Sequence, residues 1–235
     1  MPIFHADAFA ENCIHFYSKT LDNSCYTPVA FNICIQDYVK IRVEDTFQVT
    51  ASRRETMPIN ENTTWAEVGD ISTGGSGHVR DAFKGSAAKK VLLGPTFKMY
   101  KFNEYQSLTA PNSKAVSPWW SPYEAYEWDG GWQQRKSLAA HLKVSMREFG
   151  RVTSAIKENW NSLSYLLVVE VKTPVYAYFG GFAQMSRIDA GQASKVNASI
   201  EAKGSTKNLP GGGTQFYIPN LTSDDVTLVS VDLLS

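Results

Sequence analysis

The residues best suited to bind a flat molecule are four tryptophans within fourteen residues: Trp119, Trp120, Trp128 and Trp132. The same stretch, 117–132, also holds two tyrosines, two prolines and a Gly-Gly pair, so it has too many turn-forming residues for one regular helix or strand. Aromatic rings that carry a polar N–H or O–H at one edge suit a pocket for a planar ligand. The alternative is a small hydrophobic core beneath a long surface loop.

A second unusual segment begins with three glycines at 211–213, which lead directly into Thr214, Gln215, Phe216 and Tyr217. Glycine permits backbone conformations closed to other residues and lets a chain pass close to a ligand. A wide turn would explain the glycines equally well. It explains less well why they adjoin a strand that Pro219 ends early or confines to a sheet edge.

The standard catalytic and metal-binding motifs are absent from this sequence. There is no phosphate-binding GxxxxGK[ST] loop, no GxSxG elbow and no HExxH pair, and the four histidines are scattered without ligand spacing. Three cysteines, Cys13, Cys25 and Cys34, form no CxxC pair, which argues against a disulfide framework and a zinc site. The sequence does not decide whether two of them form a disulfide bond, and we expect no metal site.

Composition narrows the class of protein further. With 235 residues, 43% hydrophobic and 20% charged, the chain can bury a core and does not belong to the disordered, collagen-like or coiled-coil classes. Because 23 basic residues balance 23 acidic ones, no global field favours nucleic acid or an anionic membrane. No apolar run is long enough to span a bilayer, and the N-terminus does not resemble a signal peptide. We therefore expect synthesis in the cytoplasm without a signal peptide.

The hydrophobic pattern predicts an α+β fold, with antiparallel β-sheets and helices packed to one side. One amphipathic helix is expected over 137–160, with Ser137 as its N-cap and with Gly150 as a place for a bend or a division into two helices. A subdomain boundary is expected at 60–77. The expected domains are an N-terminal extension or subdomain of unknown role, 1–87, and a domain at 88–235. The predicted strands lie at 31–35, 38–43, 91–93, 96–102, 165–171, 175–179, 215–219 and 226–231.

The order of these elements over about 88–235 resembles the catalytic core of the mono-ADP-ribosyltransferase toxin superfamily, bacterial proteins that split NAD and pass ADP-ribose to a target. Tyr100-Lys101 stands where that family has an aromatic-Arg pair that holds the NAD phosphate. The segment 117–121, Ser-Pro-Trp-Trp-Ser, resembles its Ser-centred motif, which shapes the nicotinamide pocket. The segment 214–219 resembles the strand that carries the catalytic Glu four residues before a Pro, and Gln215 occupies that position.

Two departures from the family pattern bear on catalysis. Lys101 offers a point charge where Arg would offer a two-pronged donor to phosphate. Gln215 can hydrogen-bond a ribose hydroxyl, but it cannot supply the negative charge that stabilises an oxocarbenium-like transition state. Three explanations account for Gln at the position of the family's Glu: an alignment shifted by some residues, a relative of the family that binds its ligand without turnover, or an inactivating substitution.

The resemblance implies an ADP-ribosyltransferase-like core that takes NAD as its substrate and needs no metal. It places Gln215 and Ser117 at the catalytic position, and Lys101, Trp119, Trp120 and Tyr217 around NAD. It also implies a toxin or effector, secreted by a specialised system, that transfers ADP-ribose to a macromolecule of a host or competitor cell, with a protein as the expected target. An immunity or delivery partner belongs to this interpretation; nucleic-acid binding and membrane insertion do not.

Two other functions compete with this interpretation. In the first, the chain is a non-catalytic module whose Trp-rich loop binds a protein or carbohydrate, since exposed tryptophans are common anchors of interfaces. The second is an unrelated hydrolase, for which the sequence holds no motif. Within the Trp-rich stretch we expect 117–120 at the cleft, and 123–132 packing the loop onto the long helix.

Overall fold

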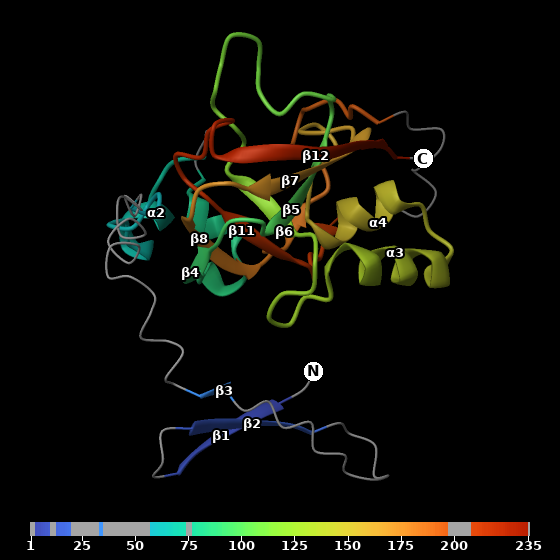
Figure 1. The fold of residues 1–235 in the computed structure, drawn as a ribbon. Helices are drawn as coiled ribbons and strands as arrows, with labels where there is room; N and C mark the ends of the chain where they lie inside the picture. Colours follow the sequence, from blue (N-terminus) through green and yellow to red (C-terminus); the bar gives the residue numbers. More distant parts are fainter. Residues whose placement is uncertain are drawn as a thin grey trace. The chain divides into compact units, whose positions relative to one another are not determined.

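A computed structural model of the chain divides by its internal contacts into two units, Met1–Glu55 and Thr56–Ser235 (Figure 1). The structure describes residues 57–73, 77–196 and 208–234, together with the backbone of three strands nearer the N-terminus. Those strands, β1 (Ile3–Phe9), β2 (Cys13–Lys19) and β3 (Ile33–Cys34), form an antiparallel sheet in the first unit. The predicted strand at 31–35 contains β3, whereas 38–43 lies outside the described residues. Residues 56–87 belong to the second unit.

The second unit holds a seven-stranded sheet in which every neighbouring pair is antiparallel, in the order β12-β7-β5-β6-β11-β8-β4. A separate two-stranded sheet pairs β9 (Met185–Ser186) with β10 (Asn208–Leu209). This mixed α/β architecture with an antiparallel sheet confirms the fold class at that level. The bounds of the seven strands are β4 (Lys89–Leu93), β5 (Lys98–Asn103), β6 (Trp119–Pro122), β7 (Tyr165–Val171), β8 (Val175–Gly181), β11 (Thr214–Tyr217) and β12 (Val226–Leu233).

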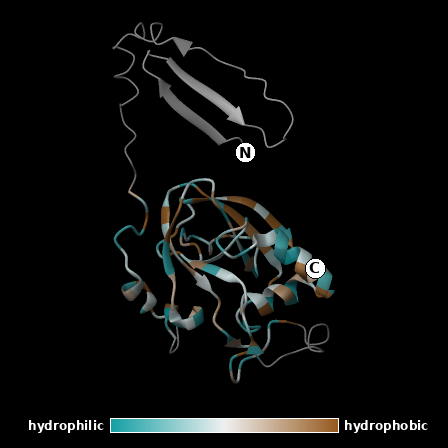
Figure 2. Cartoon of the chain, turned by 90° about the horizontal axis from the view of Figure 1, so that it is seen from below, coloured by the Kyte–Doolittle hydropathy of each residue, from teal (hydrophilic) through white to brown (hydrophobic). Residues whose placement is uncertain are grey.

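All seven strands contribute side chains to one buried cluster, which we call the central core. Because side chains alternate along a strand and the register aligns these residues, they lie on one face of the sheet, which we call the inner face; the opposite face is the outer face. Figure 2 shows hydrophobic stretches along these strands. One representative from each strand, from β4 to β12, is Val91, Met99, Trp120, Val169, Phe179, Phe216 and Val226.

Helices cover the outer face of the sheet at two separate places. Over β5 and β7, helices α3 (Gly131–Leu142) and α4 (Met146–Thr153) lie side by side, and Trp132 packs with Tyr100 and Phe102 (Figure 1). Over β8 and β11, the short helix α2 (Trp65–Gly69) and the 3-10 turns η2 (Val79–Ala82) and η3 (Lys84–Ser86) form the cover. None of the helices in the described ranges is long and apolar enough to cross a membrane.

The single helix predicted over 137–160 is wrong; the chain forms two helices, as the alternative allowed, and Ser137 lies inside α3 and is not an N-cap. Helix α3 begins at Gly131 and ends where Lys143 adopts a left-handed conformation (φ 57°), and Ser145 then caps α4 by accepting a hydrogen bond from the Glu148 N–H. The break therefore lies before Gly150. That glycine serves packing instead, since a Cβ there would lie 2.3 Å from the Phe102 ring.

Candidate functional site

The three segments that carry the family resemblance lie on adjacent strands, in the order β5, β6, β11. Their side chains nevertheless diverge. The register pairs Trp120 with Phe216 and Trp119 with Tyr217, and consecutive residues of a strand point to opposite faces. Gln215 and Tyr217 therefore point to the outer face with Trp119. Lys101 points to the inner face with Trp120, so the structure does not bring Lys101 and Gln215 together.

Lys101 and Trp120 meet at the central core. The Lys101 Nζ lies 5.7 Å from the centre of the Trp120 ring, and burial lowers the pKa of Lys101 to about 8. The Trp120 indole N–H donates to the Ser117 carbonyl at 2.7 Å. The Ser117 hydroxyl accepts from the Trp119 N–H at 3.4 Å, which fixes the turn into β6. Ser117 thus holds the backbone locally, and Trp120 is part of the core.

Gln215, Trp119 and Tyr217 lie on an outer surface that α2, η2 and η3 enclose, which we call the covered face. The Gln215 side chain is 2% exposed, and its Nε2 donates to the Ala82 carbonyl in η2 at 2.7 Å. The rings of Trp119 and Tyr217 meet edge to face with centres 4.6 Å apart, and Phe83 of the cover packs on Trp119. The cover therefore occupies the surface to which Gln215 points.

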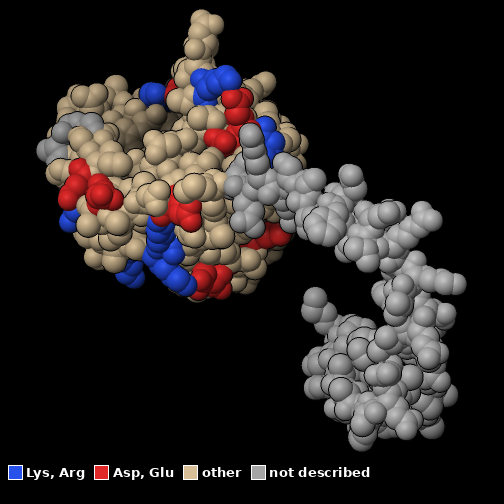
Figure 3. Space-filling model, turned by 60° about the vertical axis from the view of Figure 1, so that its left-hand side comes forward, with Lys and Arg blue, Asp and Glu red and all other residues tan. Residues whose placement is uncertain are grey.

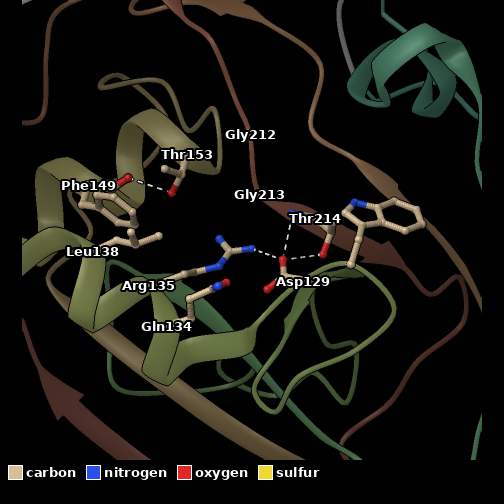
Figure 4. A pocket seen from close by; sticks show the side chains of 10 residues that line it. Asp129, Gln134, Arg135, Leu138, Phe149, Thr153, Gly212, Gly213 and Thr214 are labelled. Atoms are coloured by element: carbon tan, nitrogen blue, oxygen red, sulfur yellow. Dashed lines mark hydrogen bonds and ion pairs between the residues drawn. The ribbon is translucent and has the colours of Figure 1, made fainter.

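An open pocket of about 130 Å³ lies at the start of β11, between α3, α4 and the glycine segment. We call it the Arg135 pocket (Figure 4). It contains none of the six residues that the resemblance places at the NAD site; the residue of β11 that reaches it is Thr214. Its lining consists of Trp128, Asp129, Gln134, Arg135, Leu138, Phe149, Thr153, Gly212, Gly213 and Thr214.

A buried ion pair forms the floor of this pocket. The Arg135 Nη2 lies 2.5 Å from the Asp129 Oδ2, and the two residues are 5% and 8% exposed. The same carboxylate accepts hydrogen bonds from the Thr214 hydroxyl (2.6 Å), the Thr214 N–H (3.1 Å) and the Gly131 N–H (2.8 Å). Burial alone would raise the pKa of Asp129, but the Arg135 charge and these hydrogen bonds outweigh it and hold the pKa below its usual value.

The three glycines of this segment serve two different purposes. Gly211 and Gly212 adopt φ values of 76° and 114°, which L side chains rarely adopt. At Gly213 a Cβ would lie 2.5 Å from both terminal nitrogens of Arg135, so the bare backbone lets the guanidinium lie against it. The expected close approach at this segment is therefore to a charged side chain of the protein.

Sequence reasoning missed Asp129 and Arg135. The only signal was local: Asp129 stands directly before a Gly-Gly pair where a helix begins, and Arg135 follows on that helix. In the described ranges, no group of three or more histidine, cysteine, aspartate or glutamate side chains could hold a metal ion. Figure 3 shows basic and acidic side chains interspersed on the face in view.

No protein-family model matches the chain, and no curated protein matches it. Two solved structures are similar to it. One, described as the structure of Tne2 in complex with Tni2, is 12% identical, with a TM-score of 0.36 over 63% of this chain and 92% of that chain. The other, described as Rhs1-CT in complex with its cognate immunity protein RhsI1, is 14% identical, with a TM-score of 0.37 over 63% of this chain and 82% of that chain. Similarity at this level establishes neither a shared fold nor a shared activity.

Proposed function

We propose that the chain is an NAD-binding protein of the mono-ADP-ribosyltransferase type, a toxin or effector that acts on a target macromolecule. The observation that carries this proposal is the adjacency of β5, β6 and β11. The segments with Lys101, Ser117 and Gln215 are far apart in the sequence, and a shared NAD site requires their strands to lie together. An antiparallel sheet offers many other strand orders, so the adjacency of these three strands supports the proposal.

The Arg135 pocket is where we propose that part of NAD binds. It lies at the Thr214 end of β11, one residue from Gln215, and it is open where the covered face is filled. A pocket of about 130 Å³ is small beside the 300–1,000 Å³ of typical ligand sites. It therefore receives one ring or one phosphate group, and the rest of the dinucleotide lies across its mouth beside Trp128.

Efficient turnover is not expected from this arrangement. Gln215 has no carboxylate, and its amide is engaged with Ala82. Asp129 is the one carboxylate among the residues that line the pocket, and four donors already occupy it. A carboxylate that is fully hydrogen-bonded within the protein is poorly placed to stabilise a developing positive charge on a ligand. We therefore propose NAD binding with little or no glycohydrolase activity.

Isothermal titration with NAD tests the proposal directly, because it needs no turnover. Gln134→Trp, at the pocket wall, should weaken NAD binding by filling the pocket. Gln133→Trp is the matched control, since Gln133 is exposed on the same helix and does not line the pocket. Absence of NAD binding to the unaltered chain at millimolar concentrations would sink the proposal. Equal NAD affinity in the two variants would show that NAD binds outside this pocket.

The binding-module alternative is favoured by one observation, the exposure of Trp128, which is 67% exposed at the mouth of the pocket. An exposed tryptophan that lines a pocket with the exposed Leu138 is typical of a surface that receives a partner. Tryptophan fluorescence separates the two functions. A change on adding NAD supports the nucleotide site, whereas a change only with an oligosaccharide or a protein partner supports the module.

A further inference from the structure

The guanidinium of Arg135 has donors beyond those that the protein uses. Its hydrogen bonds to described residues engage one N–H on Nη2, with Asp129, and one on Nη1, with the Ser154 hydroxyl at 3.4 Å. A guanidinium carries five N–H groups in one plane. Figure 4 shows this group directed into the space bounded by Thr153, Gly213 and Thr214. A ligand in the pocket would therefore meet a flat edge of donors.

The charge at the pocket floor favours an acceptor that carries negative charge. Asp129 offsets the charge of Arg135, but the Gly131 N–H that also binds Asp129 is in the first residue of α3, a twelve-residue helix. The N-terminus of such a helix contributes roughly half a positive charge. The Asp129 charge is thus shared among Arg135, Thr214 and the N-terminus of α3, so it does not offset the Arg135 charge alone.

The wall opposite the ions is apolar. Leu138 and Phe149 line one side of the pocket, and Trp128 lies at its mouth with its ring centre 5.0 Å from that of Phe179. A buried cation beside an apolar wall and an exposed indole matches a ligand that joins an anionic group to a flat ring. A simple ion would leave the apolar wall unused, and a neutral ring would leave the guanidinium donors unused.

We infer that the Arg135 pocket binds the phosphate or pyrophosphate group of a ring-bearing phosphoester, with Arg135 as the anion-binding residue in place of Lys101. The identification of that phosphoester as NAD rests on the proposed function, but the anion site does not. Arg135 supplies the charged, planar donor that phosphate recognition requires. Lys101, on the inner face against Trp120, does not reach this pocket.

Charge placed at the mouth of the pocket tests the site without disturbing its floor. Leu138 lines the pocket and is 45% exposed, and Leu142, one turn further along α3, is 59% exposed and does not line it. Leu138→Glu and Leu142→Glu change the net charge equally and are both tolerated at exposed positions. Leu138→Glu should weaken pyrophosphate binding about fivefold, and Leu138→Lys should strengthen it by a similar factor. Leu142→Glu and Leu142→Lys should change it less than about twofold, because the charge is a helical turn further away and screened.

The titrations use inorganic pyrophosphate, ADP-ribose, NAD and nicotinamide, at low ionic strength and followed by calorimetry. Pyrophosphate and ADP-ribose are expected to bind with the Leu138 dependence, and nicotinamide is expected to bind without it. If no anion binds the unaltered chain, or if the Leu138 and Leu142 variants respond alike, the inference is overturned.

The outcome with NAD separates this inference from the proposed function. If pyrophosphate binds with the Leu138 dependence and NAD does not bind, the anion site stands and the proposed function fails. If NAD binds with an affinity that is indifferent to the charge at Leu138, the proposed function stands and the inference fails. Both are supported only if NAD and ADP-ribose share the response of pyrophosphate.

Discussion

The covered face and the Arg135 pocket both adjoin β11, and they differ in what fills them. On the covered face, aromatic rings from the strands and from the α2–η3 cover pack together, and the Gln215 amide is satisfied by Ala82. In the pocket, the buried groups are ions, Asp129 and Arg135, and space remains beside them. Aromatic rings can fill a surface completely, whereas a guanidinium keeps unused donors that a ligand can satisfy.

Two adjacent residues of β11 face these two regions. Thr214 and Gln215 are neighbours on β11, and their side chains leave the strand in opposite directions. Thr214 reaches the pocket and binds Asp129, while Gln215 reaches the cover. A ligand in the pocket can therefore contact Thr214, and a ligand on the opposite face of β11 would have to displace the cover to reach Gln215.

The largest effect is expected from removing the anion at the pocket floor. Asp129→Ala leaves the buried Arg135 without its partner and breaks the two hydrogen bonds to Thr214, so the free energy of unfolding should fall by about 3–5 kcal/mol. Urea unfolding at neutral pH measures the loss. Glu127→Ala is the control, because it removes an exposed partner of Lys89 and should cost no more than about 1 kcal/mol.

The loss in Asp129→Ala should also depend on pH. The folded protein holds the pKa of Asp129 below its usual value, so the carboxylate stabilises the fold above that usual value, and its contribution disappears as the pH falls through the lowered one. The gap between the unaltered chain and the variant should therefore narrow in acid. A gap below about 1 kcal/mol at neutral pH would mean that the ion pair does not organise the pocket.

On the covered face, the informative change is Gln215→Glu, which would introduce the catalytic Glu that the resembling family has at this position. Here the new carboxylate replaces the amide donor that faces the Ala82 carbonyl, so the carbonyl loses its hydrogen bond and a buried charge lies against an acceptor. The free energy of unfolding should fall by about 2 kcal/mol or more at neutral pH. Burial raises the pKa of such a carboxyl, so the penalty should shrink as the pH falls and the group is protonated.

Gln215→Met separates the lost hydrogen bond from the new charge, because it keeps the length of the side chain. It should cost less than Gln215→Glu at neutral pH and show no such pH dependence. If Gln215→Glu is as stable as the unaltered chain and has glycohydrolase activity, then α2, η2 and η3 do not cover Gln215 in solution. The catalytic position would then be 215, as the family pattern implies.

At the glycine segment the expected effect is smaller. Gly213→Ala would place a Cβ 2.5 Å from the Arg135 nitrogens, and the resulting shift of a buried ion pair should lower the free energy of unfolding by about 1–3 kcal/mol. Gly94→Ala meets no atom within 4 Å and should change it by less than about 0.5 kcal/mol. Equal effects at the two glycines would show that Arg135 does not lie against the segment.

Most strands could be predicted from the sequence because their signal is local. The pattern at 165–171 gives β7 with the same bounds, and 175–179 and 226–231 fall within β8 and β12. The prediction of a single helix failed for two reasons. Leu138 and Leu142 fit the apolar spacing of a buried helix face, but both are exposed in the fold. Lys143 ends α3, and Ser145 begins α4. Periodicity reports which residues are apolar, and tertiary packing decides which of them are buried.

The candidate site was less predictable for a different reason. The three motifs fall on the neighbouring strands β5, β6 and β11, but the face to which Lys101 or Gln215 points depends on register, which the sequence motifs do not contain. The Arg135 pocket joins residues from α3, α4 and the glycine segment. No spacing rule connects Asp129 with Thr214, 85 residues later, before the sheet is formed.

The Trp-rich stretch offers the smallest effect and a direct comparison of the two regions. Trp128 is exposed at the pocket, so Trp128→Ala should lower the free energy of unfolding by only about 0.5–1 kcal/mol, the value of its contact with Phe179. Trp119→Ala should cost more, because that ring packs between Phe83 and Tyr217 beneath the cover. Acrylamide quenching of the fluorescence should fall in Trp128→Ala and change little in Trp119→Ala. Similar quenching in the two variants would mean that the cover leaves Trp119 accessible, and a ligand could then reach both sides of β11.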